Sequence, residues 1–230
     1  RLVRRLVVWP LLPDAEGCRD RDRLLNPIDE ADFRARAAGR LHAAPPRAHG
    51  FSDDDLNPTA RMIPQNEEPK PAAVLVPLVL HPEPTVLLTL RSADLKAHAG
   101  QVSFPGGRLE EGETPIAAAL REAEEEIGLH TGLPEIVGEL PPLLTGTGFI
   151  ITPVVALLRP PFSLNPHPGE VAETFEYPLS HVTDPAKPER RSREFRGETR
   201  EFWVWPHDRH YIWGATASVL VTLASVLRED

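Results

Sequence analysis

"REAEEEIGL", residues 121–129, places glutamate at four of the six positions from Arg121 to Glu126. Alanine, leucine and isoleucine surround these glutamates, which predicts a packed helix. Like charges at i,i+3 and i,i+4 spacing repel each other and destabilise a helix by roughly a few tenths of a kcal/mol per pair. Stability alone therefore does not account for this much negative charge in one helix.

The predicted helix has recognisable ends and two distinct faces. Thr114 is suited to the N-cap, Pro115 to the first helical position and Gly128 to the C-terminal stop. An apolar stripe is expected to face the core, formed by Ile116, Ala119, Leu120, Ala123 and Ile127. A neighbouring arc carries three carboxylates, those of Glu122, Glu125 and Glu126. Glu124 points elsewhere and is expected to be solvated.

Three carboxylates on one arc have two interpretations. A solvated acidic face with arginine partners such as Arg121 is the commoner meaning of a charge run. The alternative is a site for a hard divalent cation, because Mg²⁺ and Mn²⁺ prefer oxygen ligands. The spacing of the preceding residues favours the cation site.

That spacing follows a fixed pattern. Five residues separate Gly107 from Glu113, and seven more lead to Arg121. The pattern G-x5-E-x7-R-E-U-x-E-E-x-G-U, in which U is apolar, is matched at every fixed position up to Leu129. The stretch resembles the Nudix box. The resemblance implies an α/β (α+β) fold, a Nudix-like α/β/α sandwich with a mixed β-sheet, a glutamate-rich catalytic helix and a C-terminal helix.

The resemblance also implies a chemistry and a set of site residues. Nudix enzymes hydrolyse a diphosphate linked to another group, and Mg²⁺ or Mn²⁺ neutralises charge as water attacks phosphorus. The implied metal ligands are Glu122, Glu125, Glu126 and the carbonyl of Gly107. Arg121 and Glu113 are implied to form an ion pair that orients the loop and helix, with direct metal contact by Glu113 as the alternative. Gly106 and Gly107 are expected to form a turn through which backbone approaches the metals.

A second motif stands upstream of the box. "LLTLRSADLKAHAGQVSFPGG", residues 87–107, resembles the signature of the coenzyme A pyrophosphatase branch of the Nudix superfamily. This resemblance implies cleavage of coenzyme A or a derivative to 3′,5′-ADP and 4′-phosphopantetheine. Arg91 and His98 are candidate contacts for the 3′-phosphate, and Gly106 and Gly107 complete the expected substrate site. Alternatively, Arg91 caps a strand end.

Two other functions stay open at this point. One is a Nudix hydrolase of ADP-ribose, dinucleotides or nucleoside triphosphates, and the other is a non-catalytic Nudix-fold binding module. The general base is open as well. "HPGEVAETFEYPLS", residues 167–180, offers Glu170, Glu173 and Glu176. We prefer Glu170, which follows Gly169 in a predicted loop, and Glu125 is the further alternative.

The rest of the chain divides into two regions. Apolar, β-branched runs predict strands at 72–80, 85–91, 135–140, 149–158, 174–179, 193–196 and 201–205, and a terminal helix is predicted at 215–228. The first two strands are expected to form a hairpin. Residues 26–42 predict a helix with Asn26 as its cap, and 43–71 an irregular segment. We therefore expect an N-terminal extension over 1–71 and the hydrolase domain over 72–230.

Composition limits the class of partner. The chain has 230 residues and a net charge of −9, which gives no electrostatic support for binding nucleic acid or an anionic membrane. Cys18 is the single cysteine, so no internal disulfide can form, which favours a cytoplasmic location. No apolar run approaches the roughly 18 residues of a transmembrane helix, and we expect no signal peptide. The expected partner is a small diphosphate, and the oligomeric state, including a homodimer, stays open.

Overall fold

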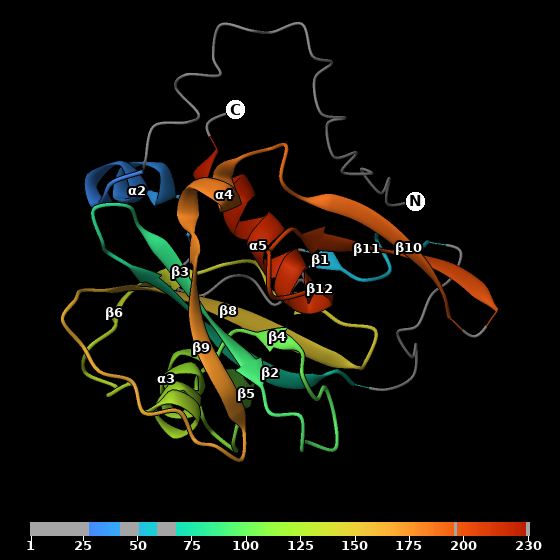
Figure 1. Ribbon diagram of the computed structural model, residues 1–230, viewed down its shortest axis with the longest axis horizontal. Helices are drawn as coiled ribbons and strands as arrows, with labels where there is room; N and C mark the ends of the chain where they lie inside the picture. Colours follow the sequence, from blue (N-terminus) through green and yellow to red (C-terminus); the bar gives the residue numbers. More distant parts are fainter. Residues whose placement is uncertain (1–27, 42–50, 59–67, 196, 229–230) are drawn as a thin grey trace, which may run out of the picture.

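The computed structural model describes residues 28–41, 51–58, 68–195 and 197–228, and Figure 1 shows their arrangement. The main sheet is mixed and contains β1 (Phe51–Ser52), β2 (Lys70–Val79), β3 (Thr85–Arg91), β4 (Val102–Ser103), β5 (Gly106–Arg108), β6 (Glu135–Glu139), β7 (Leu143–Leu144), β8 (Phe149–Leu158) and β9 (Val171–Pro178). A smaller sheet contains β10 (Glu189–Phe195), β11 (Glu198–Trp205) and β12 (Ile212–Trp213). The described helices are α2 (Glu30–Ala37), α3 (Pro115–Ile127), α4 (Leu179–Thr183) and α5 (Gly214–Leu227).

Strand β2 lies at the centre of the main sheet. It pairs in parallel with β8 from Lys70↔Phe149 to Val79↔Leu158, and antiparallel with β3 and β5. Its side chains alternate between the two faces, so Leu75 packs in the cluster below α3 and Val76 in the cluster below α5. A strand buried on both faces reads as a continuous apolar run, which explains why β2 was predictable from sequence.

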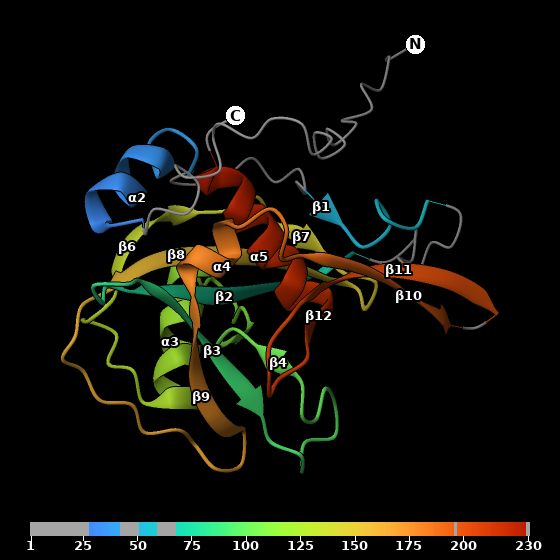
Figure 2. The same cartoon turned by 45° about the horizontal axis from the view of Figure 1, so that its top comes forward.

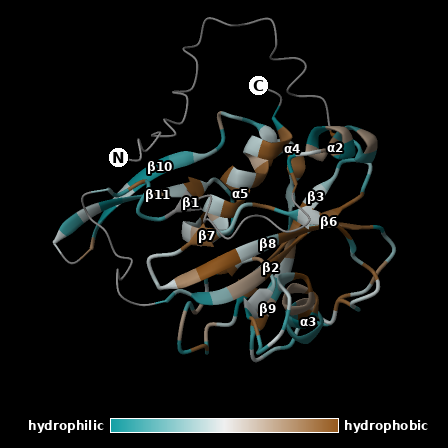
Figure 3. Ribbon diagram, turned by 180° about the vertical axis from the view of Figure 1, so that it is seen from behind, coloured by the Kyte–Doolittle hydropathy of each residue, from teal (hydrophilic) through white to brown (hydrophobic). Residues whose placement is uncertain are grey.

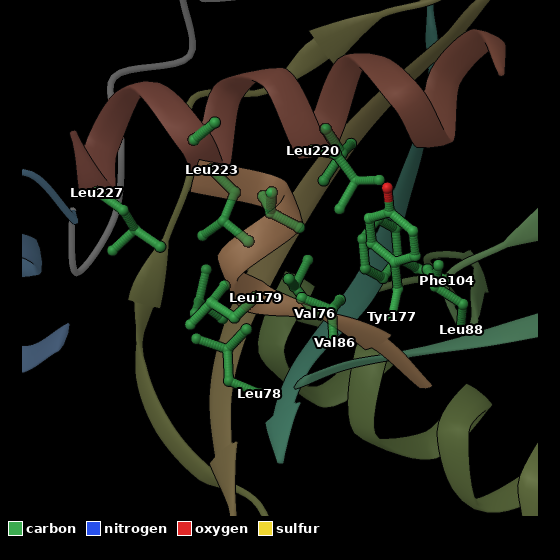
Figure 4. Close-up of a cluster of buried hydrophobic side chains, with 14 of the residues drawn as sticks. Val76, Leu78, Val86, Leu88, Phe104, Tyr177, Leu179, Leu220, Leu223 and Leu227 are labelled. Atoms are coloured by element: carbon green, nitrogen blue, oxygen red, sulfur yellow. The ribbon is translucent and has the colours of Figure 1, made fainter. Parts of the chain in front are cut away.

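Helices cover both faces of this sheet, as the sequence predicts. Figure 2 shows α3 on one face and α2, α4 and α5 on the other. Figure 4 shows the second layer, in which leucines of α5 lie over side chains of β2, β3 and β9, among them Val76, Leu88 and Tyr177. No helix in the described ranges is long and apolar enough to cross a membrane. The mixed sheet between two helical layers confirms the predicted fold class.

The described part of residues 1–71 packs against the same core. Phe33 and Ala37 of α2 are buried in the cluster that contains α5. The guanidinium of Arg36 donates to the carbonyl of Leu227 at 3.2 Å, which satisfies a carbonyl at the C-terminal end of α5. Strand β1 also pairs with β7 in the main sheet. The boundary at residue 72 stays a prediction, but the two regions share a sheet and a core.

Several element limits differ from the prediction. Helix α2 begins at Glu30, and Asp29 caps it by accepting from the N–H of Asp32 at 2.8 Å; the predicted cap, Asn26, lies outside the described residues. The glycines at 106 and 107 form the short strand β5 against β2, so the prediction of a simple turn there was wrong. The strands of two or three residues were missed because so few positions carry no readable alternation.

Candidate active site

Helix α3 is held at both ends by the predicted residues. The hydroxyl of Thr114 accepts a hydrogen bond from the N–H of Ala117 at 3.2 Å, and Pro115 lies in the first turn. At the other end Gly128 has a φ of 66°, a left-handed conformation that glycine adopts without a Cβ clash. These caps are confirmed, and they set the register in which α3 presents its glutamates.

The glutamates of α3 differ strongly in their exposure. The side chain of Glu126 is 4% exposed, that of Glu122 is 18% exposed and that of Glu125 is 59% exposed. Glu124 is exposed, as its place on the helix predicts. Ala118 is buried as well, so the buried face of α3 is wider than the predicted apolar stripe. Glu126 lies at the edge of this buried face.

Arg121 is the centre of the polar network on α3. Its Nε and Nη2 donate to the two carboxylate oxygens of Glu113 at 2.9 and 3.1 Å. Its Nη1 donates to Glu122 at 3.0 Å and to Glu125 at 3.1 Å, and Nη2 also donates to the carbonyl of Arg108. The Arg121 hydrogen bonds hold the pKa of Glu113 below its usual range. The guanidinium therefore ties the loop before α3 to the helix.

Glu126 is a buried carboxylate with two partners. One oxygen accepts from Nη1 of Arg91 at 3.3 Å, and the other accepts from the N–H of Gly106 at 3.2 Å. Burial, together with the nearby carboxylates of Glu122 and Glu170, raises the pKa of Glu126 to about 7 against the opposing effect of these two partners. A cation at this position would therefore stabilise the charged form.

The three carboxylates expected to bind metal are directed at different partners. Within the described ranges, no three His, Cys, Asp or Glu side chains are gathered closely enough to hold a metal ion. Arg121 draws Glu122 and Glu125 to one side, whereas Arg91 and Gly106 hold Glu126. The donor chemistry fits a hard divalent cation. Gathering the carboxylates around one ion requires that arginine contacts be exchanged for metal contacts.

Two glycines allow the close approach of β5 to its neighbours. A Cβ on Gly106 would lie 2.3 Å from the carbonyl oxygen of Ala73 and 2.6 Å from Cα of Val74. A Cβ on Gly107 would lie 2.4 Å from a carboxylate oxygen of Glu122. Any other residue at 107 would push this carboxylate away, so the glycine creates the space in which Glu122 lies against backbone.

A cleft of about 890 Å³ opens beside these glycines. Its lining includes all four residues predicted to contact substrate, namely Arg91, His98, Gly106 and Gly107. His98 lies at the rim with a φ of 56°, and its Nδ1 is 3.0 Å from Oε1 of Gln101. The structure thus brings the upstream motif to one cleft, and Glu126 of α3 contacts that cleft through Arg91 and Gly106.

The three candidate bases on the later loop and strand have different surroundings. Glu173 accepts from Arg209 at 2.6 Å, and Glu176 lies 3.0 Å from Nε2 of His81. Glu170 instead lies near enough to the α3 carboxylates to raise the pKa of two of them. Glu170 is therefore the candidate that the fold brings near the α3 carboxylates, which lie beside the cleft.

Comparison with known proteins agrees with this geometry. A family model described as the NUDIX domain matches residues 69–209. The chain belongs to the Nudix family. An uncharacterized Nudix hydrolase NudL from Photorhabdus laumondii is 43% identical over 154 residues, which cover 66% of this chain and 82% of that protein. A Nudix hydrolase NudL from Shigella flexneri is 39% identical over 177 residues, covering 75% and 92%.

Solved Nudix structures are also similar. The Nudix hydrolase RenU from M. smegmatis has a TM-score of 0.45 and 26% identity, covering 55% of this chain and 83% of its own. The NUDIX domain of Shewanella oneidensis NrtR, solved with ADP ribose, has a TM-score of 0.40 and 20% identity, covering 50% and 77%. Membership makes the chain a diphosphate hydrolase, and Nudix hydrolases generally use divalent metal ions such as Mg²⁺ or Mn²⁺.

Sequence reasoning missed the far wall of the Nudix cleft. The lining there comes from residues 53–57, from the β10–β11 hairpin and from the start of α5. Asn57, Arg193 and Arg200 belong to this wall, although they lie far from the Nudix box in sequence. Arginine at every second position of β10, at 191 and 193, was a weak signal of a charged strand face.

Proposed function

We propose that the chain is a metal-dependent diphosphatase of coenzyme A or its derivatives, with 3′,5′-ADP and 4′-phosphopantetheine as products. One observation carries the proposal. The segment 87–107, which resembles the coenzyme A pyrophosphatase signature, supplies Arg91, His98, Gly106 and Gly107 to a single cleft beside the carboxylates of α3. A motif that runs from β3 through β4 into β5 thus contributes four residues to one place.

Mg²⁺ or Mn²⁺ is proposed to be held by Glu122, Glu125, Glu126 and the carbonyl of Gly107. When bound, the metal offsets the charge of the diphosphate and activates water. Burial raises the pKa of both Glu122 and Glu126, which means that the fold leaves negative charge without full solvation at these positions. An acidic site can accept an anionic diphosphate only when cations lie between them.

The remaining site residues are proposed to position these groups. Arg121 holds Glu113 with two hydrogen bonds, and this pair fixes the loop between β5 and α3 to the helix. Arg91 orients Glu126 and offers its guanidinium to the cleft. His98, at the rim, offers a ring nitrogen to substrate. Glu170 is the preferred base that accepts a proton from the attacking water, and Glu125, the most exposed ligand, is the alternative.

Product analysis with a panel of diphosphates tests this proposal. The panel contains coenzyme A, dephospho-coenzyme A, ADP-ribose, a dinucleotide and a nucleoside triphosphate, each with Mg²⁺, with Mn²⁺ and with chelator. We expect coenzyme A to have the highest kcat/KM and to give 3′,5′-ADP, with negligible hydrolysis in chelator. Faster turnover of ADP-ribose would overturn the coenzyme A assignment, and full activity in metal-free buffer would overturn the metal site.

A further inference from the structure

Two arginines face each other across the β10–β11 hairpin. Arg193 of β10 is the cross-strand partner of Arg200 of β11, and both residues line the cleft. Like charges directly opposite each other on an antiparallel pair are destabilising. Figure 3 shows how hydrophilic the hairpin is beside the apolar strands β2 and β8. The carboxylate of Asp54 lies 3.6 Å from the guanidinium of Arg200 and offsets its charge, so the cost that remains falls on Arg193.

Neighbouring arginines on the same strand are neutralised. Arg190 lies 3.3 Å from a carboxylate oxygen of Glu201, and Arg191 lies 2.7 Å from one of Glu189. Within the described ranges, by contrast, no carboxylate lies within ion-pair distance of Arg193. The two arginines of β10 that do not line the cleft are thus paired, and Arg193, which lines it, is available for a ligand.

A third arginine extends this basic region toward Gly107 and the α3 carboxylates beside the cleft. Arg108 directly follows Gly107 and also lines the cleft, and its guanidinium lies 5.1 Å from the ring centroid of Phe149. No carboxylate of the described residues pairs with it. Stacking on an aromatic ring holds a guanidinium in place without neutralising it. Arg108 is therefore a positioned cation between Gly107 and the hairpin.

The balance of charge in the cleft is opposite to that of the whole chain. The chain has a net charge of −9, yet four arginines line the cleft, against the carboxylates of Asp53 and Glu201. Of these carboxylates, Glu201 is paired with an arginine outside the lining. Asp53 accepts from the N–H of Gly146 at 2.8 Å. Arg91 is paired with Glu126, and Arg200 lies 3.6 Å from Asp54. No carboxylate of the described residues lies within ion-pair distance of Arg193 or Arg108, so the charge of these two arginines is available to an anion.

Aromatic side chains lie beside the arginines. Phe202 and Trp213 form an edge-to-face pair with ring centroids 5.5 Å apart, and both line the cleft. Such rings provide a surface on which a nucleobase can stack. Cations and aromatic rings together are the chemistry that recognises a nucleotide carrying a phosphate.

We propose that Arg193, Arg200 and Arg108 form a second anion subsite that binds a phosphomonoester of the substrate nucleotide, separate from the diphosphate that is cleaved. The 3′-phosphate of coenzyme A is such a group, so the subsite rests on and deepens the proposed function. Arg91 lines the cleft where it approaches α3, because its guanidinium contacts Glu126. Recognition of the 3′-phosphate is thereby assigned mainly to the hairpin, and Arg91 and His98 act nearer the diphosphate.

Binding of the nucleotide product tests the subsite without catalysis. Affinities for 3′,5′-ADP and 5′-AMP are measured by calorimetry in chelator, for the unmodified chain, Arg193→Ala and the control Arg191→Ala. The control removes the same charge from the same strand, but Arg191 does not line the cleft. We expect the unmodified chain and the control to prefer 3′,5′-ADP by about tenfold, a typical effect of one charge-assisted contact. Arg193→Ala should lose most of that preference, and Arg193→Lys should recover part of it.

The same variants are compared for kcat/KM on coenzyme A and dephospho-coenzyme A. The subsite is supported if the ratio of kcat/KM for coenzyme A to kcat/KM for dephospho-coenzyme A falls in Arg193→Ala but not in Arg191→Ala. The subsite is overturned if Arg193→Ala changes neither the binding preference for 3′,5′-ADP over 5′-AMP nor the ratio of kcat/KM values. This holds even when coenzyme A is the best substrate of the unmodified chain. A preference for 3′,5′-ADP that Arg193→Ala removes, in a chain that does not hydrolyse coenzyme A, keeps the subsite and rejects the proposed function. Because Arg193 is exposed on β10, its replacement is not expected to unfold the protein.

Discussion

The candidate site has two ends, the α3 carboxylates beside the cleft and the hairpin wall that lines it, and these ends are built in opposite ways. At the α3 end, carboxylates are matched by an arginine of the same short stretch, because Arg121 reaches Glu113, Glu122 and Glu125. At the hairpin end, Arg193 and Arg200 face each other, and the hairpin is anchored by Asn57, which lies 144 positions before Glu201 in the chain. The α3 network is thus made by residues close together in sequence, whereas the hairpin wall is made by segments that only the fold brings together.

This difference separates reaction chemistry from substrate recognition. The spacing of a loop and a helix fixes the relative places of ligands for a metal, whatever the rest of the substrate is. A wall made from distant segments can change residue by residue without disturbing that spacing. We therefore expect substitutions at the α3 end to lower turnover of every substrate, and substitutions at the hairpin end to alter the preference among substrates.

The largest effect is expected at the α3 end. Glu126→Gln and Glu125→Gln keep the side-chain shape but remove a charge from the proposed metal site. We expect each to lower kcat by at least about a hundredfold, or ~2.7 kcal/mol, for all substrates. Glu124→Gln is the matched control, since Glu124 is exposed and lies off the arc. Equal damage from Glu124→Gln would show that the assigned face of the helix is wrong.

A smaller effect, on stability, is expected where the hairpin wall is anchored. Asn57 is buried, and its side chain donates to the carbonyl of Glu201 at 3.0 Å and accepts from its N–H at 2.7 Å. Asn57→Ala leaves these buried groups unpaired and should cost about 2 kcal/mol of unfolding free energy. Thermal unfolding checks this, with a decrease in Tm of roughly 4–8 °C for a chain of this size.

Asn165→Ala is the control for that measurement, because Asn165 is exposed and its change should leave Tm within about 1–2 °C. The comparison also predicts that kcat at saturating substrate is nearly unchanged in Asn57→Ala, since α3 does not depend on this anchor. A loss of kcat as large as that of Glu126→Gln would contradict the separation of the two ends.

The smallest of these effects is expected at Gly107, where the two ends meet. In Gly107→Ala, the new Cβ would lie 2.4 Å from a carboxylate oxygen of Glu122, which is the movable end of a side chain. The protein should fold, but Glu122 must turn away, and we expect kcat to fall by about tenfold, or ~1.4 kcal/mol. Gly132→Ala, which meets only the ring of His130 at 3.3 Å, should have normal activity. Normal activity in Gly107→Ala would mean that the position of Glu122 is not needed.

Much of the fold was predictable from sequence for a local reason. The strands β2, β3 and β8 are long apolar runs rich in β-branched residues, and α3 carries both of its caps. Strand β5 was not predictable, because three residues containing two glycines carry no alternation, and its pairing with β2 depends on how closely the backbones approach. The width of the buried face of α3 was not predictable either, because it depends on which strands of the sheet pack against the helix.

By itself the sequence determined the Nudix box, the positions of the long strands along the chain, the caps of α3 and the residues proposed for metal and diphosphate. Each of these depends on spacings within a short stretch, where backbone geometry fixes which side chains lie together. Only the tertiary structure decided that Glu126 is buried between Arg91 and Gly106, that Glu170 lies near it, and that Arg193 and Arg200 line the same cleft. These relations join segments far apart in the chain, and a distance between such segments exists only once the core has packed.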